Sequence, residues 1–281
     1  MSRLIHISTM TRKDPFMKKV NLCLLSAVML LMGSCIQKPK SSPPSALFQI
    51  STIDALLAGC YDGVMPIRDL HRYGNFGIGT YEKADGEMIM LNDTIYQIKA
   101  DGTARTSQLP DSTPFATVIR FHPDTAFTGD PRIALDSLRQ LITRQFPNLN
   151  LVVAVKISGR FERMKTRSVP PQEKPYRPLN EVVATQQKIR DSSDISGTVV
   201  GFYLPAFVKG INVPGYHLHF ISDDRKTGGH LFECILVEGT IEWQICHQLD
   251  LMLPNEKSAF GLVDFTKDRS GDLQKVIKLK K

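Results

Sequence analysis

Short apolar runs of strand-forming residues, separated by turn formers, recur along this chain and predict more strand than helix. Short strand patterns cover residues 76–82, 87–91 and 94–99. Asp85-Gly86 and Asn92-Asp93 separate these patterns and are typical of tight hairpin turns. The first third of the chain therefore contains several short, neighbouring antiparallel strands.

Further strand patterns occupy the second half of the chain. An apolar run over residues 149–157 predicts a buried strand, and four prolines within residues 168–178 predict an extended loop after it. Everything after Ser193 is predicted to be antiparallel and all-β. The strand patterns there cover residues 199–204, 216–221, 231–237 and 240–246.

Helical spacing is confined to two segments. Residues 51–59 predict a short helix with Ser51 as the N-cap and Gly59 at its end. Asp130-Pro131 provides a cap and a proline at the first helical position, and apolar residues then recur at helical spacing as far as Phe146. The predicted fold class is α/β of the α+β type. It combines an N-terminal mixed sheet and helices with a C-terminal, mostly antiparallel β unit that carries a zinc site.

The first 35 residues have the pattern of an export signal. Met17-Lys18-Lys19 begins a basic segment before an apolar run over 20–32, and Gly33-Ser34-Cys35 is similar to a bacterial lipobox in which Cys35 becomes lipidated. We therefore expect a signal peptide over 1–35, a flexible linker over 36–47 and an exported, lipid-anchored domain over 48–281. The domain is divided into subdomains 48–190 and 194–281. The alternative is a cleaved signal that releases a free domain.

Charge and cysteine content exclude some classes of protein. Residues 1–35 hold five basic residues and one acidic residue, so only about +3 of the chain's +7 belongs to the domain. This charge is small and no predicted helix carries a basic stripe, so no nucleic-acid partner is predicted. The basic residues over 275–281 are interpreted as a solvated tail. Cys60, Cys234 and Cys246 are interpreted as free thiols, with a disulfide between Cys234 and Cys246 as the alternative.

Three histidines form the most informative motif. His217 and His219 lie two residues apart in a strand pattern, so both side chains point to the same face. A polar turn then leads to His230, which a hairpin brings across from the pair. Three neutral imidazoles with a vacant fourth position suit a catalytic Zn²⁺. The alternative is a polar strand face that carries imidazoles and binds no metal.

With these motifs in order, the chain resembles the alpha-acetolactate decarboxylases. The blocks that carry the resemblance are the run 77–81 with Asp85-Gly86-Glu87, and then residues 164–170, 201–203, 215–225 and 228–230. The resemblance implies conversion of 2-acetolactate, a small-molecule substrate, to acetoin and carbon dioxide, with Zn²⁺ on the three histidines. It also implies a homodimer.

The resemblance further assigns roles to individual residues. Glu87 matches a functional glutamate of the family and is expected to donate a proton. Arg167 matches the family's active-site arginine and is expected to orient the substrate carboxylate, while Thr80 is expected to contact substrate. A second family glutamate near the C-terminus has no counterpart within residues 272–281, and Glu256 is the nearest upstream glutamate.

Two other functions remain open at this point. A cupin-like metal oxygenase or isomerase also uses His-x-His on an antiparallel strand, and iron rather than zinc would favour that class. A surface lipoprotein with an impaired metal site would fit the missing glutamate.

Overall fold

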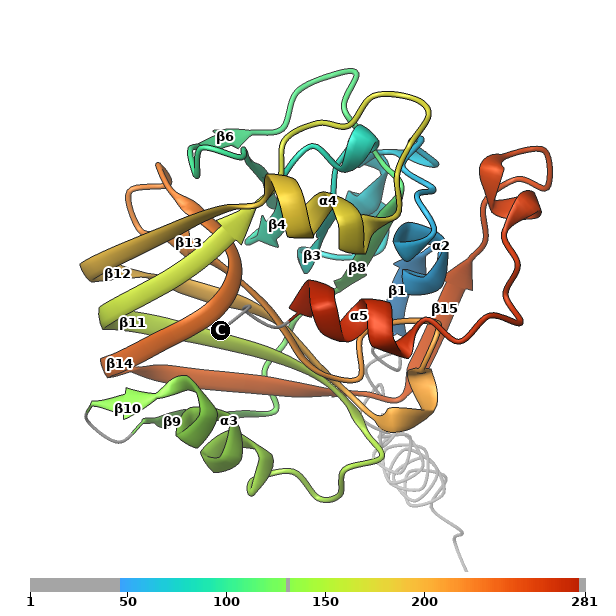
Figure 1. Ribbon diagram of the computed structural model, residues 1–281. Coiled ribbons are helices and arrows are strands. Elements are labelled where there is room, and N and C mark those ends of the chain that lie inside the picture. The colour runs from blue at the N-terminus through green and yellow to red at the C-terminus, as the bar shows by residue number, and fades with distance from the viewer. Residues whose placement is uncertain (1–45, 130–131, 278–281) are drawn as a thin grey trace, which may run out of the picture. The chain divides into compact units, whose positions relative to one another are not determined.

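Two β-sheets and a few helices build the part of the chain that the computed structural model describes, residues 46–129 and 132–277 (Figure 1). The described residues all belong to one compact unit. The predicted signal peptide over 1–35 and most of the predicted linker lie outside the described residues. The described residues confirm a mixed α and β fold that contains far more strand than helix.

The first sheet has seven strands in the order β15-β1-β8-β3-β4-β5-β6. It is mixed, as predicted, because β15 runs parallel to β1 while the other neighbours are antiparallel. Ala46 and Leu47, which were assigned to the linker, pair with β15 and so belong to this sheet. The strands are β1 (Ala46–Ile50), β3 (Phe76–Thr80), β4 (Glu87–Leu91), β5 (Thr94–Ile98), β6 (Ala104–Thr106), β8 (Phe115–Ile119) and β15 (Gln248–Met252).

The second sheet is dominated by four long antiparallel strands, which are prominent on the left of Figure 1. They are β11 (Val152–Ser168), β12 (Lys188–Leu204), β13 (Gly215–Ser222) and β14 (Gly228–Cys246). β14 pairs with β11 along most of its length and with β13 at its first residues, so the four strands close on themselves. Short strands β9 (Thr125–Thr128) and β10 (Ile133–Ala134) also pair with β14. A separate two-stranded sheet joins β2 (Met65–Pro66) to β7 (Ser112–Thr113).

The predicted subdomain boundary does not coincide with the boundary between the sheets. Residues 190–194 lie inside β12, and β15 from the C-terminal part completes the first sheet. The two strands predicted over 231–237 and 240–246 are one continuous strand, β14. The prediction that everything after Ser193 is antiparallel and all-β is wrong, because β15 is parallel to β1 and a helix, α5 (Ser270–Ile277), follows.

The helices are short. α2 (Ile53–Leu57) is capped by the Thr52 side chain rather than by Ser51, whose φ of 59° places it in the left-handed region. The other helices are α3 (Leu135–Thr143), α4 (Leu179–Gln186) and α5, and there are short 3₁₀-helices at η1 (Ile67–Arg72), η2 (Glu82–Ala84), η3 (Ala206–Val208) and η4 (Ala259–Leu262). None of the described helices is long and apolar enough to cross a membrane.

The predicted start of the second helix needs correction. Asp130 and Pro131 lie outside the described residues, but Ile133 and Ala134 form β10 and pair with Leu236 and Ile235 of β14. The helix α3 begins only at Leu135. Pairing with the long strand β14 therefore takes precedence over the local helical pattern for these two residues.

Of the two predicted hairpin turns, one is confirmed and the other is longer than expected. Asn92 and Asp93 both have positive φ, 51° and 62°, as a tight two-residue turn between twisted strands requires. The connection from β3 to β4 instead holds the 3₁₀ turn η2 before Asp85-Gly86. This longer connection sets the position of Glu87 at the start of β4.

Apolar packing ties the sheets and helices together. One cluster joins the faces of the two sheets, including Ile78 of β3 and Val200 of β12. A second cluster gathers α2, α4 and α5 around Tyr61. Cys60, Cys234 and Cys246 are all free, as predicted. Cys234 and Cys246 lie on the same strand, twelve residues apart, which excludes a disulfide between them because an extended strand rises about 3.3 Å per residue.

Candidate metal centre and active site

The three predicted histidines converge where β13 and β14 meet. His217 and His219 lie on β13, and His219 stands directly across from His230 in the antiparallel register. One ring nitrogen from each of the three histidines lies within 4.8 Å of the others, and the ring centroids are 5.2–5.3 Å apart. The hairpin therefore brings together three imidazole nitrogens at the spacing that a single metal ion can bridge.

Hydrogen bonding fixes the ring of His219 in the form that a metal requires. Its Nδ1 lies 3.0 Å from the backbone carbonyl of Met88 on β4, and only an N–H can donate to a carbonyl. The lone pair is consequently on Nε2, which is buried and has no hydrogen-bond partner among the described residues. A backbone carbonyl that orients one ring nitrogen while the other stays free is the usual arrangement behind a metal-binding histidine.

The surroundings keep all three imidazoles neutral. Burial lowers the pKa of His217 and of His230 well below the usual value. Burial also lowers the pKa of His219 to about 3, although its bond to Met88 acts in the opposite direction. Because a metal binds only the unprotonated imidazole, these residues need not lose a proton at neutral pH to bind one.

A buried ion pair stands next to the histidines. The Arg167 Nη1 lies 2.6 Å from Glu87 Oε1, and the two side chains are only 6% and 8% exposed. The other Glu87 oxygen, Oε2, lies 3.4 Å from His219 Nε2. Burial raises the pKa of Glu87 and the guanidinium of Arg167 opposes that rise, while burial lowers the pKa of Arg167. The two predicted catalytic residues and the histidines thus share one site.

Strand register and two polar side chains place Glu87 and Arg167. Arg167 is the partner of His230 in the pairing of β11 with β14, and Glu87 opens β4 opposite Thr80. The Thr80 hydroxyl donates to the carbonyl of Gly86 at 2.7 Å, and the Gln97 amide donates to the carbonyl of Asp85 at 2.6 Å. Both bonds hold the turn immediately before Glu87.

A small pocket of about 40 Å³ opens onto this site. Thr80, Arg167, His217 and His230 form its polar side. Its other walls are apolar and come from α2, β8, α4, the segment before β13, and α5. No carboxylate occurs among the described residues that line it.

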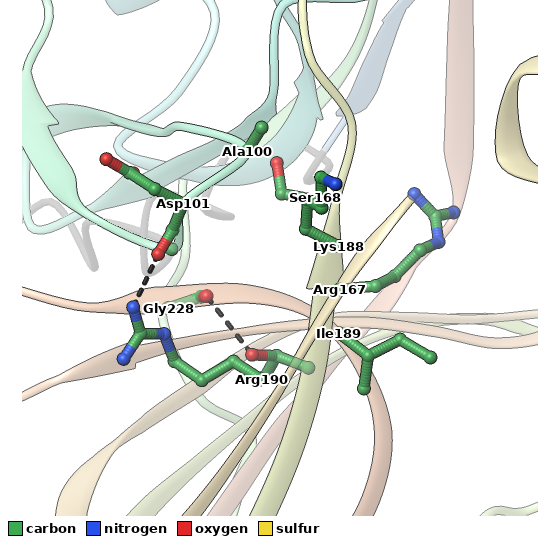
Figure 2. A pocket seen from close by; sticks show the side chains of 10 residues that line it. Ala100, Asp101, Arg167, Ser168, Lys188, Ile189, Arg190 and Gly228 are labelled. Carbon is green, nitrogen blue, oxygen red and sulfur yellow. Dashed lines mark hydrogen bonds between the residues drawn. The ribbon is translucent and has the colours of Figure 1, made fainter. Parts of the chain in front are cut away.

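A second cavity, of about 520 Å³, lies close to the backbone of Arg167 (Figure 2). Lys188 and Arg190 of β12 line it, and the Arg190 guanidinium donates to the backbone carbonyl of Asp101. Figure 2 shows the guanidinium of Arg167 turned away from Asp101 and Arg190. The positive charge of Arg167 is therefore directed toward Glu87 rather than into this cavity.

Comparison with known proteins gives the family. The family model described as alpha-acetolactate decarboxylase matches residues 47–267. The chain belongs to the alpha-acetolactate decarboxylase family. The alpha-acetolactate decarboxylase of Methanosarcina mazei is 43% identical over 83% of this chain and 80% of its own length. That of Bacillus subtilis is 40% identical over 82% and 91%.

Solved structures of alpha-acetolactate decarboxylases share the fold. The crystal structure of the enzyme from Bacillus subtilis strain 168 superposes with a TM-score of 0.81 at 37% identity, and it covers 84% of this chain and 100% of that one. A Staphylococcus aureus protein described as similar to alpha-acetolactate decarboxylase superposes with a TM-score of 0.77 at 28% identity, over 82% and 98% of the two chains. All five residues predicted for the site lie within the range that the family model matches.

The structure also bears on the second glutamate that the resemblance led us to expect. Glu256 is exposed in the loop after β15 and is not among the residues that line the pocket. The C-terminal segment instead contributes the apolar residues Leu273, Val276 and Ile277 of α5. Residues 275–277, interpreted above as the start of a solvated tail, are helical, and Val276 is buried.

Sequence reasoning missed three contributors to the site. The Met88 carbonyl is backbone and carries no sequence signal. Gln97 reads as an ordinary strand residue, although its side chain is 1% exposed and fixes the turn before Glu87. The wall from α5 had a faint signal, because Leu273, Val276 and Ile277 recur at helical spacing.

Proposed function

We propose that this chain catalyses the zinc-dependent decarboxylation of 2-acetolactate to acetoin and carbon dioxide. The observation that carries the proposal is the convergence of three neutral imidazoles beside the buried Glu87–Arg167 pair, in a member of the alpha-acetolactate decarboxylase family. His217, His219 and His230 fit a zinc ion, since all three are nitrogen ligands and the free Nε2 of buried His219 is directed to the site. When bound there, zinc supplies a Lewis acid that polarises the oxygens of the substrate.

Arg167 binds and orients the substrate carboxylate in this proposal. It lines the pocket, Glu87 occupies its Nη1, and its Nε has no partner among the described residues. A planar guanidinium with free N–H groups suits a carboxylate. Because Glu87 already shares its charge, Arg167 holds the departing carboxylate less tightly than a free guanidinium would, which limits stabilisation of the ground state.

Glu87 donates the proton in this proposal. Departure of carbon dioxide breaks the bond to the carbinol carbon and shifts its electron pair toward the ketone, so a proton must reach carbon to complete acetoin. Glu87 Oε2 is the carboxylate oxygen that lies next to the histidines in the described part of the chain, 3.4 Å from His219 Nε2. The apolar walls of the pocket keep water from competing with this transfer.

Acetoin release from racemic 2-acetolactate tests the proposal. The purified protein is stripped with a chelator, assayed, and assayed again after addition of zinc or iron(II). Turnover that disappears with the chelator and returns with zinc supports the reaction and the metal. Preferential recovery with iron favours the oxygenase or isomerase class, and one bound zinc per chain without acetoin indicates an impaired metal-binding protein.

We also propose that the domain is exported and anchored by a lipid on Cys35. The support is the basic pair Lys18 and Lys19, the apolar run over 20–32 and the small residues before Cys35. Ten residues separate Cys35 from Ala46, where β1 begins. Such a tether spans about 33 Å when extended, which is enough to hold the domain clear of a membrane surface.

A further inference from the structure

The pocket at the histidines is sharply divided between polar and apolar residues. Its polar side carries the chemistry described above, whereas the remaining walls are entirely aliphatic or aromatic. Loss of carbon dioxide changes bonding at the carboxylate, the ketone and the carbinol carbon of the substrate, and leaves its alkyl groups unchanged. The alkyl groups of the substrate must therefore lie against the apolar walls.

α5 supplies one continuous part of that apolar wall. Leu273, Val276 and Ile277 face the pocket, and Leu273 and Val276 are 7% and 4% exposed. α5 packs on α4 in the same apolar cluster, and the Asn180 amide donates to Asp272 Oδ1 at 2.8 Å. The family match ends at residue 267, so this wall comes from a segment beyond the matched range, unlike every other wall of the pocket.

The space between these walls is small. About 40 Å³ is free, far less than the roughly 150 Å³ of a cavity that accepts a benzene molecule. The α5 wall must therefore yield when a substrate enters, and the required displacement grows with each added methylene. Close-packed interiors resist such displacement, so the free-energy cost rises with the size of the alkyl group.

We propose that α5, through Val276 and Ile277, determines which 2-alkyl homologues of 2-acetolactate this enzyme accepts. The wall favours the methyl group of 2-acetolactate and disfavours ethyl and longer groups at the carbinol carbon. This inference rests on the proposed function, since it specifies the substrate range of the same site.

The test compares kcat/KM for 2-acetolactate with kcat/KM for its 2-ethyl homologue. The wild-type protein is expected to prefer the methyl substrate by about tenfold or more, and Val276→Ala is expected to reduce that preference by about fivefold or more. Ile277→Ala is expected to act in the same direction. Val276→Ile adds one methyl group to the wall and should increase the preference for the methyl substrate.

Val183→Ala is the matched control. Val183 is 2% exposed and belongs to the same apolar cluster as α5, but it is not among the residues that line the pocket. It loses the same two methyl groups as Val276→Ala, so any general loss of stability is comparable while the wall is unchanged. Its substrate preference should equal that of the wild-type protein.

Binding measurements separate recognition from turnover. The alcohols obtained by reducing the ketone of each substrate cannot lose carbon dioxide by the same route, so their Kd values report fit to the pocket alone. Val276→Ala should tighten binding of the reduced 2-ethyl homologue relative to binding of reduced 2-acetolactate. Equal preferences in the wild type, Val276→Ala, Ile277→Ala and Val276→Ile would overturn the inference, whereas absence of acetoin from 2-acetolactate with the wild type would overturn the proposed function.

Discussion

Replacing Arg167 by Met removes the positive partner of Glu87 while keeping a long, unbranched side chain. In the wild-type protein the two charges lie 2.6 Å apart and both side chains are more than nine-tenths buried. After the substitution, Glu87 Oε1 loses its donor. Oε2 lies 3.4 Å from His219 Nε2, which carries a lone pair in the ring form fixed by Met88. A carboxylate would then be buried without compensation.

The expected loss of stability is large because of this burial. Removing one partner of a buried ion pair costs about 3–5 kcal/mol, whereas replacing both partners by neutral side chains is often close to neutral. The loss is a substantial fraction of the roughly 5–15 kcal/mol that typically separates folded from unfolded states. Adding Glu87→Gln to Arg167→Met should therefore recover most of it.

Urea unfolding of the chelator-treated protein measures this difference without a contribution from bound metal. Trp243 is the single tryptophan of the chain and is 6% exposed, so its fluorescence reports unfolding of the second sheet. The comparison uses the wild type, Arg167→Met and the double variant. Arg132→Met is the control, because Arg132 forms an ion pair with Glu162, through two hydrogen bonds, at an exposed position.

The unfolding midpoint of Arg132→Met should stay at the wild-type value. If Arg167→Met lost less than about 1 kcal/mol, the magnitude of a surface pair, the Glu87–Arg167 pair would not be desolvated as described. If the double variant were as unstable as Arg167→Met, the loss would come from poor packing of Met rather than from the unpaired carboxylate.

Three further outcomes are expected. His217→Ala and His230→Ala should each weaken zinc binding by more than the roughly 10- to 100-fold that loss of an outer-shell partner costs, and acetoin release should fall in parallel. The control His122→Ala, at an exposed position, should keep both zinc binding and acetoin release. Full zinc retention in both His217→Ala and His230→Ala would contradict the three-histidine site. Arg167→Lys should bind zinc normally but lower kcat/KM by roughly 100-fold, because a single ammonium cannot reproduce the guanidinium fork; a rate near that of the wild type would reduce Arg167 to a structural charge. Cys35→Ser should move the protein from the membrane fraction to the soluble fraction, and unchanged fractionation would exclude a lipid on Cys35.

Local sequence alone determined several features of this protein. The strands β3, β4 and β5 follow from short runs of strand-forming residues, and the Asn92-Asp93 turn from residues that tolerate positive φ. His217 and His219 share a strand face because side chains two residues apart in a strand point to the same side. These features depend on contacts between residues close in sequence, so the pattern contains the information needed to predict them.

The pairing of distant segments came only from the tertiary structure. β15 adds in parallel to β1 across two hundred residues, and β10 withdraws Ile133 and Ala134 from the helix that their own spacing predicts. A partner strand supplies hydrogen bonds to backbone N–H and C=O groups, and this gain outweighs the local preference of a segment for helix. Sequence patterns carry no record of which partner strand is available.

The site divides in the same way. The sequence motif and the resemblance identified His217, His219, His230, Glu87 and Arg167. The tertiary structure decided that Glu87 and Arg167 pair at 2.6 Å, that a carbonyl of β4 orients His219, and that α5 closes the pocket. The residue types determine which chemical groups the site contains. The distances between those groups, which determine the role of each residue, depend on how β4, β11, β13 and α5 pack together.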